Sequence, residues 1–461
     1  MNKYLFILGF AGMALFSACS TSDELAADIP IPSPGLTEEE KALIVEAGKD
    51  SDVPITLGSV ASSRAMTRTP IEPEIGTTLF TTPANQYLGV FCLAQGKQAG
   101  APSLVPDNAN ILWNSSEYAK WLDNVPAKVL KHNAGDASPI TGGDAQNYSY
   151  VQFLVASDLQ TETPTETPKV YYYPFGNWYY YDFFAYYPRK VGGDVWVGQG
   201  RVTVNYTITG KEDIIWARAV GGTSITDPVT DNAVNSYSAK YIRLKKEEVP
   251  GTTDYAVVPG LSFNHKLAQL VFSVKPHFED SLQLKKKGYR VTKLEVIDVY
   301  NQLELWVADK TGGDHGALKI KPLSTIDDIQ VRKTDGTDAT PNPIDVVSDN
   351  LTGIPDAEHI TPKEVGYALL PTSKMLTDAG YTNQYMVSIE MEQKDDGGNY
   401  PGDEVPNTVI TLPLPTGGFE AGKKYNITLE IYSPTNIQAK ATLAGWVDGY
   451  ANPEDGVVPV D

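Results

Sequence analysis

Residues 171–188 read Tyr-Tyr-Tyr-Pro-Phe-Gly-Asn-Trp-Tyr-Tyr-Tyr-Asp-Phe-Phe-Ala-Tyr-Tyr-Pro, the densest aromatic stretch of the chain. Aromatic residues favour strands, and the segment Phe175-Gly176-Asn177 suits a turn, so the stretch predicts two strands joined by that turn. Strand alternation would direct about half of the rings inward, which favours cross-strand aromatic pairing inside a β-sandwich. An exposed row of rings would instead stack on sugars, so Trp178 and Tyr180 are candidates for an alternative carbohydrate platform.

Short apolar runs between turn residues continue on both sides of this stretch. They occur at Tyr87–Leu93, Tyr150–Val155, Ile214–Ala219 and Leu267–Val274. The chain has 461 residues with 39 Gly and 32 Pro, which suits many strands joined by turns. This length exceeds that of one ordinary sandwich, so we expect a mainly β protein with roughly two domains. Charged residues, Pro and Gly cluster near residue 250, which predicts one domain over residues 69–250 and another over 251–461.

The N-terminus has the features of a lipoprotein signal peptide. Lys3 precedes the apolar run Tyr4–Phe16, and small residues stand directly before Cys19. The run is too short to span a bilayer as a stable helix, and a signal peptidase accepts small residues before its cleavage site. We therefore expect residues 1–18 to be removed and Cys19 to carry acyl chains that anchor the protein to the outer membrane. Cys92 is the other cysteine, so no intrachain disulfide is expected and a buried apolar role suits it.

Composition and residue spacing argue against nucleic-acid binding and catalysis. The formal net charge is -20, which would repel a polyphosphate, and no basic patch offsets it. The five His residues, His265 among them, lie at spacings that match no zinc motif. No nucleophile elbow appears, so a secreted hydrolase has no motif in its support. We therefore expect no enzyme activity, no catalytic or metal-binding residue, no cofactor and no nucleic-acid partner.

A short strand and a polar loop lie between the leader and the main body. The strand alternates apolar residues with Pro, Thr and Gly, which is the period of a half-buried strand, and its apolar residues are Val53, Ile55 and Leu57. The loop Ser62–Pro70 is polar, ends in Pro and contains Arg64 and Arg68. An exposed loop of this kind is open to a trypsin-like protease.

Several segments of the body occur together, in this order, in one protein family. They are Gln86–Phe91, Tyr181–Pro188, Asp213–Ala217, Leu261–Leu270, Ala368–Pro371, Phe419–Tyr425 and Gly445–Trp446. With the lipoprotein signal before them, the chain resembles the fimbrillin family, the type V pilins of Bacteroidales that include Mfa-like fimbrillins, over nearly the whole mature sequence. The cluster Ser20–Glu24 is similar to the signal that sends lipoproteins of these bacteria to the cell surface.

The resemblance implies a fold and a mode of assembly. The implied fold is two tandem transthyretin-like, Greek-key β-sandwich domains, and the implied role is that of a structural subunit of an adhesive fimbrium. In that assembly a protease cuts after an Arg, the first strand leaves, and the C-terminal strand of another pilin subunit fills the groove. Carried to this sequence, residues 19–68 would hold the lipidated tether and the leaving strand, with Arg64 or Arg68 as the cut site. The donor strand would lie in residues 449–461, with its apolar residues at Val457, Val458 and Val460.

Two alternatives remain open from the sequence. Gly456 and Pro459 interrupt the donor segment, and Pro cannot donate a ladder hydrogen bond. The protein could therefore be a tip or accessory subunit as well as a shaft subunit. A surface carbohydrate-binding lipoprotein that uses the aromatic cluster Tyr171–Tyr187 is the alternative function.

Overall fold

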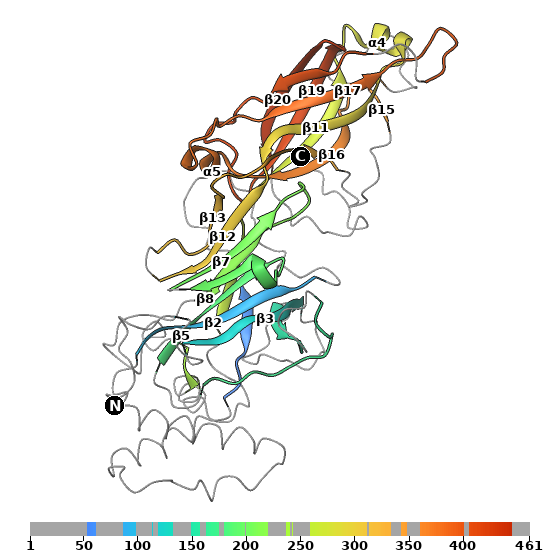
Figure 1. Cartoon of the computed structure of the whole chain (residues 1–461). Helices are drawn as coiled ribbons and strands as arrows, with labels where there is room; N and C mark the ends of the chain where they lie inside the picture. Colours follow the sequence, from blue (N-terminus) through green and yellow to red (C-terminus); the bar gives the residue numbers. More distant parts are fainter. Residues whose placement is uncertain are drawn as a thin grey trace, which may run out of the picture.

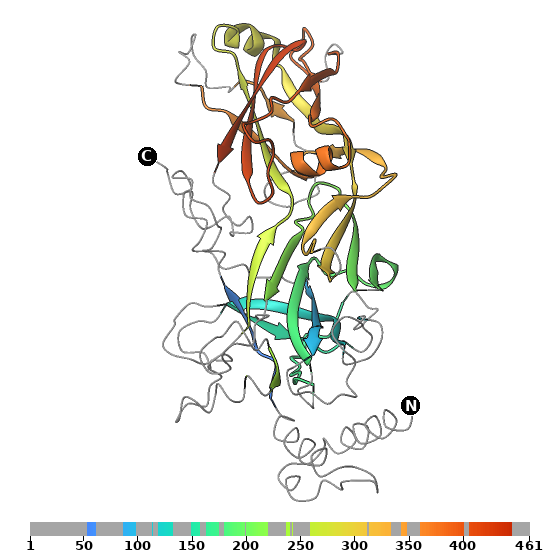
Figure 2. The same cartoon turned by 90° about the vertical axis from the view of Figure 1, so that its left-hand side faces the viewer.

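The computed structural model shows an elongated molecule built almost entirely of strands (Figures 1 and 2). It describes residues 53–60, 86–97, 113, 119–131, 149–156, 163–174, 179–198, 200–219, 237–239, 242, 259–310, 313–332, 343–347, 360–400 and 405–444. The mainly β fold class expected from the sequence is confirmed. Within the described residues, no helix is both long enough and apolar enough to cross a membrane.

Seven strands form a closed barrel at one end of the molecule, in the lower part of Figure 1. In spatial order they are β1 (Leu57–Val60), β4 (Ser149–Phe153), β3 (Lys120–Lys131), β2 (Leu88–Lys97), β5 (Tyr179–Tyr187), β8 (Ile215–Ala219) and β9 (Gly260–His265). Alternate side chains of each strand point inward, and the inward ones are apolar. Leu88, Val90 and Cys92 of β2 follow this pattern and are fully buried. The buried apolar role predicted for Cys92 is therefore confirmed.

Strand β5 carries the second half of the aromatic stretch and is buried on both faces. Its side chains alternate between the barrel interior and a second apolar core outside the barrel. Tyr181, Phe183 and Tyr187 point inward, and Phe184 and Tyr186 point outward. The rings therefore pack inside the protein, as the favoured interpretation of the sequence expected, and the outward rings are covered as well.

Residues 171–174, the described part of the first half of the aromatic stretch, belong to no strand of the barrel or the sheets. Residues 171–174 make one isolated bridge, between Tyr172 and Pro54. The predicted pairing of the two halves of the stretch is not observed for these residues. The backbone of Tyr171 and Tyr173 hydrogen-bonds to the segment before β1, and β5 pairs with β2 and β8 instead. The predicted turn and Trp178 lie outside the described residues, as does the side chain of Tyr180.

A four-stranded sheet, here called the middle sheet, covers the outer face of the barrel at β2 and β5 (Figure 1). Its order is β13 (Ala317–Ile320), β12 (Gln302–Asp309), β7 (Arg201–Thr207) and β6 (Val195–Gly198), which follows the 3-10 helix η2 (Gly192–Asp194). Its inner face places Val204 and Leu305 in one core with Phe184 of the barrel. Strands from both sides of residue 250 pair in this sheet, and the predicted division into two domains stays a prediction.

Two further sheets pack against each other at the opposite end of the molecule (Figures 1 and 2). One has the order β16 (Lys363–Leu370), β10 (Ala268–Pro276), β19 (Lys424–Ser433) and β20 (Asn436–Ala444). The other has the order β14 (Ile326–Gln330), β11 (Arg290–Tyr300), β17 (Met386–Glu392) and β18 (Thr408–Thr411), with β15 (Ile344–Asp345) paired to β11. Two short helices, α4 (Ser281–Lys287) and α5 (Ser373–Asp378), join strands in this part.

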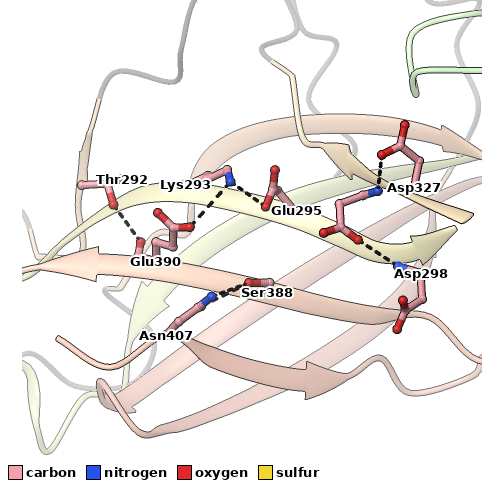
Figure 3. Close-up of polar contacts among 9 residues, drawn as sticks. Thr292, Lys293, Glu295, Asp298, Asp327, Ser388, Glu390 and Asn407 are labelled. Atoms are coloured by element: carbon pink, nitrogen blue, oxygen red, sulfur yellow. Dashed lines mark hydrogen bonds and ion pairs between the residues drawn. The ribbon is translucent and has the colours of Figure 1, made fainter.

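The outer face of the β11–β17 sheet is polar (Figure 3). Lys293 Nζ lies 2.8 Å from Glu295 and 3.6 Å from Glu390, and the side-chain amide of Asn407 donates to Ser388 Oγ at 2.9 Å. Exposed ion pairs of this kind contribute about 0–1 kcal/mol each. The stability of this half therefore comes mainly from its apolar inner faces.

The middle sheet and the two upper sheets share one apolar core. This core runs from Phe91 of the barrel exterior to Ile437 of β20. At the junction, Leu369 N donates to Gly210 O at 2.7 Å. Gly210 has a φ of +89°, and a Cβ there would lie 2.4 Å from the Ile329 side chain, so the close approach requires glycine. The junction is thus a packed contact and not an open linker.

Candidate functional site

The candidate site is the segment Val53–Val60, which the sequence predicts as a removable strand. Its second half is strand β1, and its first half is extended. Val53, Ile55 and Leu57 are 5%, 4% and 0% exposed and belong to the barrel core. The residues between them are half-buried. The alternation predicted from the sequence is therefore the alternation observed.

Backbone hydrogen bonds hold this segment along its length. Strand β1 pairs antiparallel with β4, with Leu57 opposite Val151, and parallel with β9, with Ser59 opposite Leu261. Before β1, Ile55 N donates to Tyr171 O at 2.7 Å, and Tyr173 N donates to Val53 O at 2.9 Å. The segment thus has neighbours on both sides, none of which is adjacent to it in sequence.

Strand β1 closes the barrel. It lies between β4 and β9, whereas the next strand along the chain, β2, lies between β3 and β5. Without β1, the edges of β4 and β9 would be unpaired, and the core around Val151 and Leu261 would open to water. Each large apolar side chain removed from the core would cost about 1.5–3 kcal/mol of burial free energy. A vacancy of this kind favours the binding of another apolar strand.

The barrel core and its border contain a buried thiol, a buried tyrosine hydroxyl and an ion pair whose carboxylate is buried. Arg218 Nη2 donates to the carboxylate of Asp182 at 2.6 Å, and Asp182 is 1% exposed. Burial, and secondly the charge of Asp182, raises the pKa of the Cys92 thiol well above its usual range. Burial also raises the pKa of Tyr173 well above its usual range. The thiol is therefore protonated at neutral pH and chemically inert while the barrel is closed.

The described residues contain no cluster of side chains typical of a metal centre. No group of three or more His, Cys, Asp or Glu side chains among them could hold a metal ion. His265 Nδ1 lies 2.7 Å from Asp213 Oδ2, a hydrogen-bond contact at the end of β9. This contact fits a structural role for His265.

The other predicted site residues lie outside the part of the chain that the structure describes. They are Cys19, Arg64, Arg68, Val457, Val458 and Val460. Their roles in lipidation, processing and donation of a strand stay predictions. Sequence reasoning did not identify the partners of the segment, namely β4, β9 and residues 171–173. These partners are far from residues 53–60 in the sequence, so no local sequence pattern could have revealed them.

Comparisons with known proteins identify the family of the chain. The model of the fimbrillin-like family matches residues 129–446, well over half of the chain. No curated protein matches the chain. The fold is similar to a fimbrial protein from Bacteroides vulgatus, at 14% identity and a TM-score of 0.37, with 85% of this chain and 99% of that chain covered. It is also similar to the tip fimbrial protein Mfa3 from Porphyromonas gingivalis, at 11% identity and a TM-score of 0.32, with 86% and 99% covered. On the strength of the family match, this chain belongs to the fimbrillin-like family.

Proposed function

We propose that the protein is a structural subunit of an adhesive cell-surface fimbrium that is exported as a lipoprotein and assembled by proteolysis-triggered strand exchange. Membership of the fimbrillin-like family supports the fimbrial role. The observation that carries the assembly mechanism is the burial of Val53, Ile55 and Leu57 in the barrel core, in a segment whose strand β1 pairs with both β4 and β9. Because the family is one of structural proteins, no catalytic role is proposed.

The proposed sequence of events starts at the outer membrane. Lipid on Cys19 holds the precursor at the cell surface, and β1 fills its own groove. A trypsin-like protease then cuts after Arg64 or Arg68, in the segment that connects β1 to β2. After the cut, no covalent bond joins Val53–Val60 to the barrel, so only its side-chain burial and backbone hydrogen bonds oppose its departure.

The proposed donor is the tail 449–461 of another subunit. Val457, Val458 and Val460 would supply apolar side chains to the vacant core, each with about 1.5–3 kcal/mol of burial free energy. Unpaired backbone groups of β4 and β9 would supply the hydrogen bonds. Pro459 cannot donate a backbone hydrogen bond, so a role as a tip or accessory subunit is an alternative to a role in the shaft.

Assembly can be tested with purified precursor. Full-length protein and a variant lacking residues 456–461 are cleaved with trypsin and compared on gels without boiling. A ladder from the full-length protein and none from the shortened variant is the expected result. A variant with Arg64→Gln and Arg68→Gln is the control and should stay monomeric. Identical ladders from full-length and shortened protein would exclude the tail as donor, and no ladder from either would exclude self-assembly.

Lipidation needs a separate test in cells. Cys19→Ala, or inhibition of lipoprotein signal peptidase with globomycin, should leave uncleaved or unanchored protein. The N-terminus and mass of the mature protein from the membrane fraction provide the measurement. A mature N-terminus away from Cys19 and without lipid would contradict the anchoring proposal.

The alternative carbohydrate platform at residues 171–187 gains no support from the structure. Six of its rings in β5 are buried, and Tyr173 is only 2% exposed. Tyr172 is the large exposed ring among its described residues, at 46%.

A further inference from the structure

The outer face of the middle sheet carries a flat, exposed tryptophan. Trp196 of β6 is 51% exposed. Its indole ring lies directly over Gly198, where an added Cβ would come within 2.0 Å of the ring atom Cζ2. Only glycine leaves room for the ring at this position, so one ring face rests on the strand while the residue stays open to solvent.

A second tryptophan lies in the same cross-strand row. Trp196 is paired with Thr203 of β7, and Thr203 is paired with Trp306 of β12. Neighbouring strands are about 4.8 Å apart, which places the strands of the two tryptophans about 10 Å apart. Thr203, between the rings, is 5% exposed. The next residues of β7, Val202 and Val204, point to the core, so the row is on the outer face.

Charged side chains around Trp306 are held in position by contacts. The guanidinium of Arg201 lies 3.7 Å from the centre of the Trp306 ring, and Lys319 Nζ lies 3.4 Å from it. The indole N–H of Trp306 donates to Glu304 Oε2 at 2.6 Å. Arg201 is also the pairing partner of Gly198, so it stands beside the residue that supports Trp196. Hydrogen-bond donors and a carboxylate acceptor thus surround Trp306, and by strand register Arg201 also lies next to the support of Trp196.

We propose that this surface binds a neutral saccharide, with one pyranose ring stacked on Trp196 and the hydroxyl groups of an adjoining sugar unit hydrogen-bonded by Arg201 and Glu304 beside Trp306. A sugar offers an apolar C–H face to an aromatic ring and hydroxyls that both donate and accept. The mixed charges of Arg201, Lys319 and Glu304 suit such hydroxyls and give no preference for an acidic ligand. This site is distinct from the proposed strand-exchange groove and does not depend on it.

The composition of the surface favours a sugar over a protein partner. A stable protein interface buries about 800 Å² on each partner and has an apolar centre depleted of charge. Here the row contains one exposed ring, Trp196, and the charged side chains of Arg201, Glu304 and Lys319 contact the neighbouring Trp306. One or two sugar rings suit a single exposed ring followed by polar groups.

The proposal can be tested with the uncleaved, monomeric full chain. Binding is measured on a glycan array and then by titration with the neutral sugars lactose, maltose and cellobiose, with sialyllactose as the acidic comparison. Trp196→Ala removes the indole ring. Gly198→Ala leaves Trp196 in the chain but forces its ring out of its place over residue 198. Tyr172→Ala removes another exposed ring and is the matched control. Thermal unfolding and sedimentation velocity establish that each variant is folded and monomeric.

The expected result is saturable binding of at least one neutral glycan by the wild type and by Tyr172→Ala. Affinity should fall at least about tenfold in both Trp196→Ala and Gly198→Ala, since the ring is the main contact. Absence of binding to every glycan, or equal binding by Trp196→Ala, would overturn the proposal. Wild-type self-association that Trp196→Ala abolishes would overturn it in favour of a protein contact, and a preference for sialyllactose would overturn the neutral-sugar assignment.

Discussion

Leu57 of β1 lies directly opposite Val151 of β4, and both side chains belong to the barrel core. The same short strand pairs on its other side with β9, so a few residues join two edges of the barrel. The closure of the barrel therefore depends on a segment that is far in sequence from both strands with which it pairs.

Truncation of Leu57 should destabilise the uncleaved protein. Leu57→Ala leaves a cavity in the barrel core, and such changes cost about 2–5 kcal/mol of unfolding free energy. Thr56→Ala, at a half-buried neighbouring position, should change it far less. Urea unfolding of both variants measures the difference. Equal effects of the two substitutions would contradict the inward orientation of Leu57.

The thiol of Cys92 should report whether the groove is filled. Burial raises its pKa, so Cys92 should not react with DTNB in the uncleaved protein carrying Cys19→Ala. Cleavage and loss of Val53–Val60 should expose the core and accelerate the reaction, and a peptide with the sequence of residues 449–461 should slow it again. A reaction rate unchanged by cleavage would show that the barrel stays closed without a covalent link to β1.

The sequence predicted the periodic features of this fold well and the long-range ones poorly. The alternation of Val53, Ile55 and Leu57 and the burial of Cys92 follow from local patterns, and both were correct. Phe184 is on the outer face of the barrel and is buried because β7 and β12 cover it, and a local pattern cannot place those strands. The exposed Trp196 was not predicted either, because its position depends on the missing side chain of Gly198.

Removal of the Arg218 guanidinium should destabilise the protein strongly. Arg218→Ala removes the guanidinium that lies 2.6 Å from the buried carboxylate of Asp182, and the loss of one member of a buried ion pair costs about 3–5 kcal/mol. Lys374→Ala breaks an ion pair with Asp378 whose side chains are 81% and 61% exposed, and should cost less than about 0.5 kcal/mol. Chemical unfolding of both variants provides the comparison. A cost for Arg218→Ala as small as the control would mean that water reaches Asp182.

Stability should fall in mild acid because of His315. Burial, and secondly the charge of Arg218, lowers the pKa of His315 to about 4, and its Nδ1 accepts a hydrogen bond from Asp309 N at 3.0 Å. The folded state therefore favours the neutral ring, while the unfolded chain binds a proton near pH 6.5. The contribution of His315 is complete above pH 6.5 and is lost as the pH falls from 6.5 through 4.

His315→Gln isolates this effect from the titration of the carboxylates. Unfolding free energies of wild type and variant are measured at pH 7.5 and at pH 5. The wild type should lose more stability than the variant between the two values. A parallel loss in both proteins would show that His315 is not held neutral.

The shared apolar core and the Leu369–Gly210 contact have a mechanical consequence. A subunit with a flexible hinge at this place would bend under load, and its two halves would yield one after the other. A packed junction instead passes tension from one end of the molecule to the other without an internal joint. In a filament stretched by flow, bending would then concentrate at the contacts between subunits. The stiffness of the filament would be set by the contacts between neighbouring subunits.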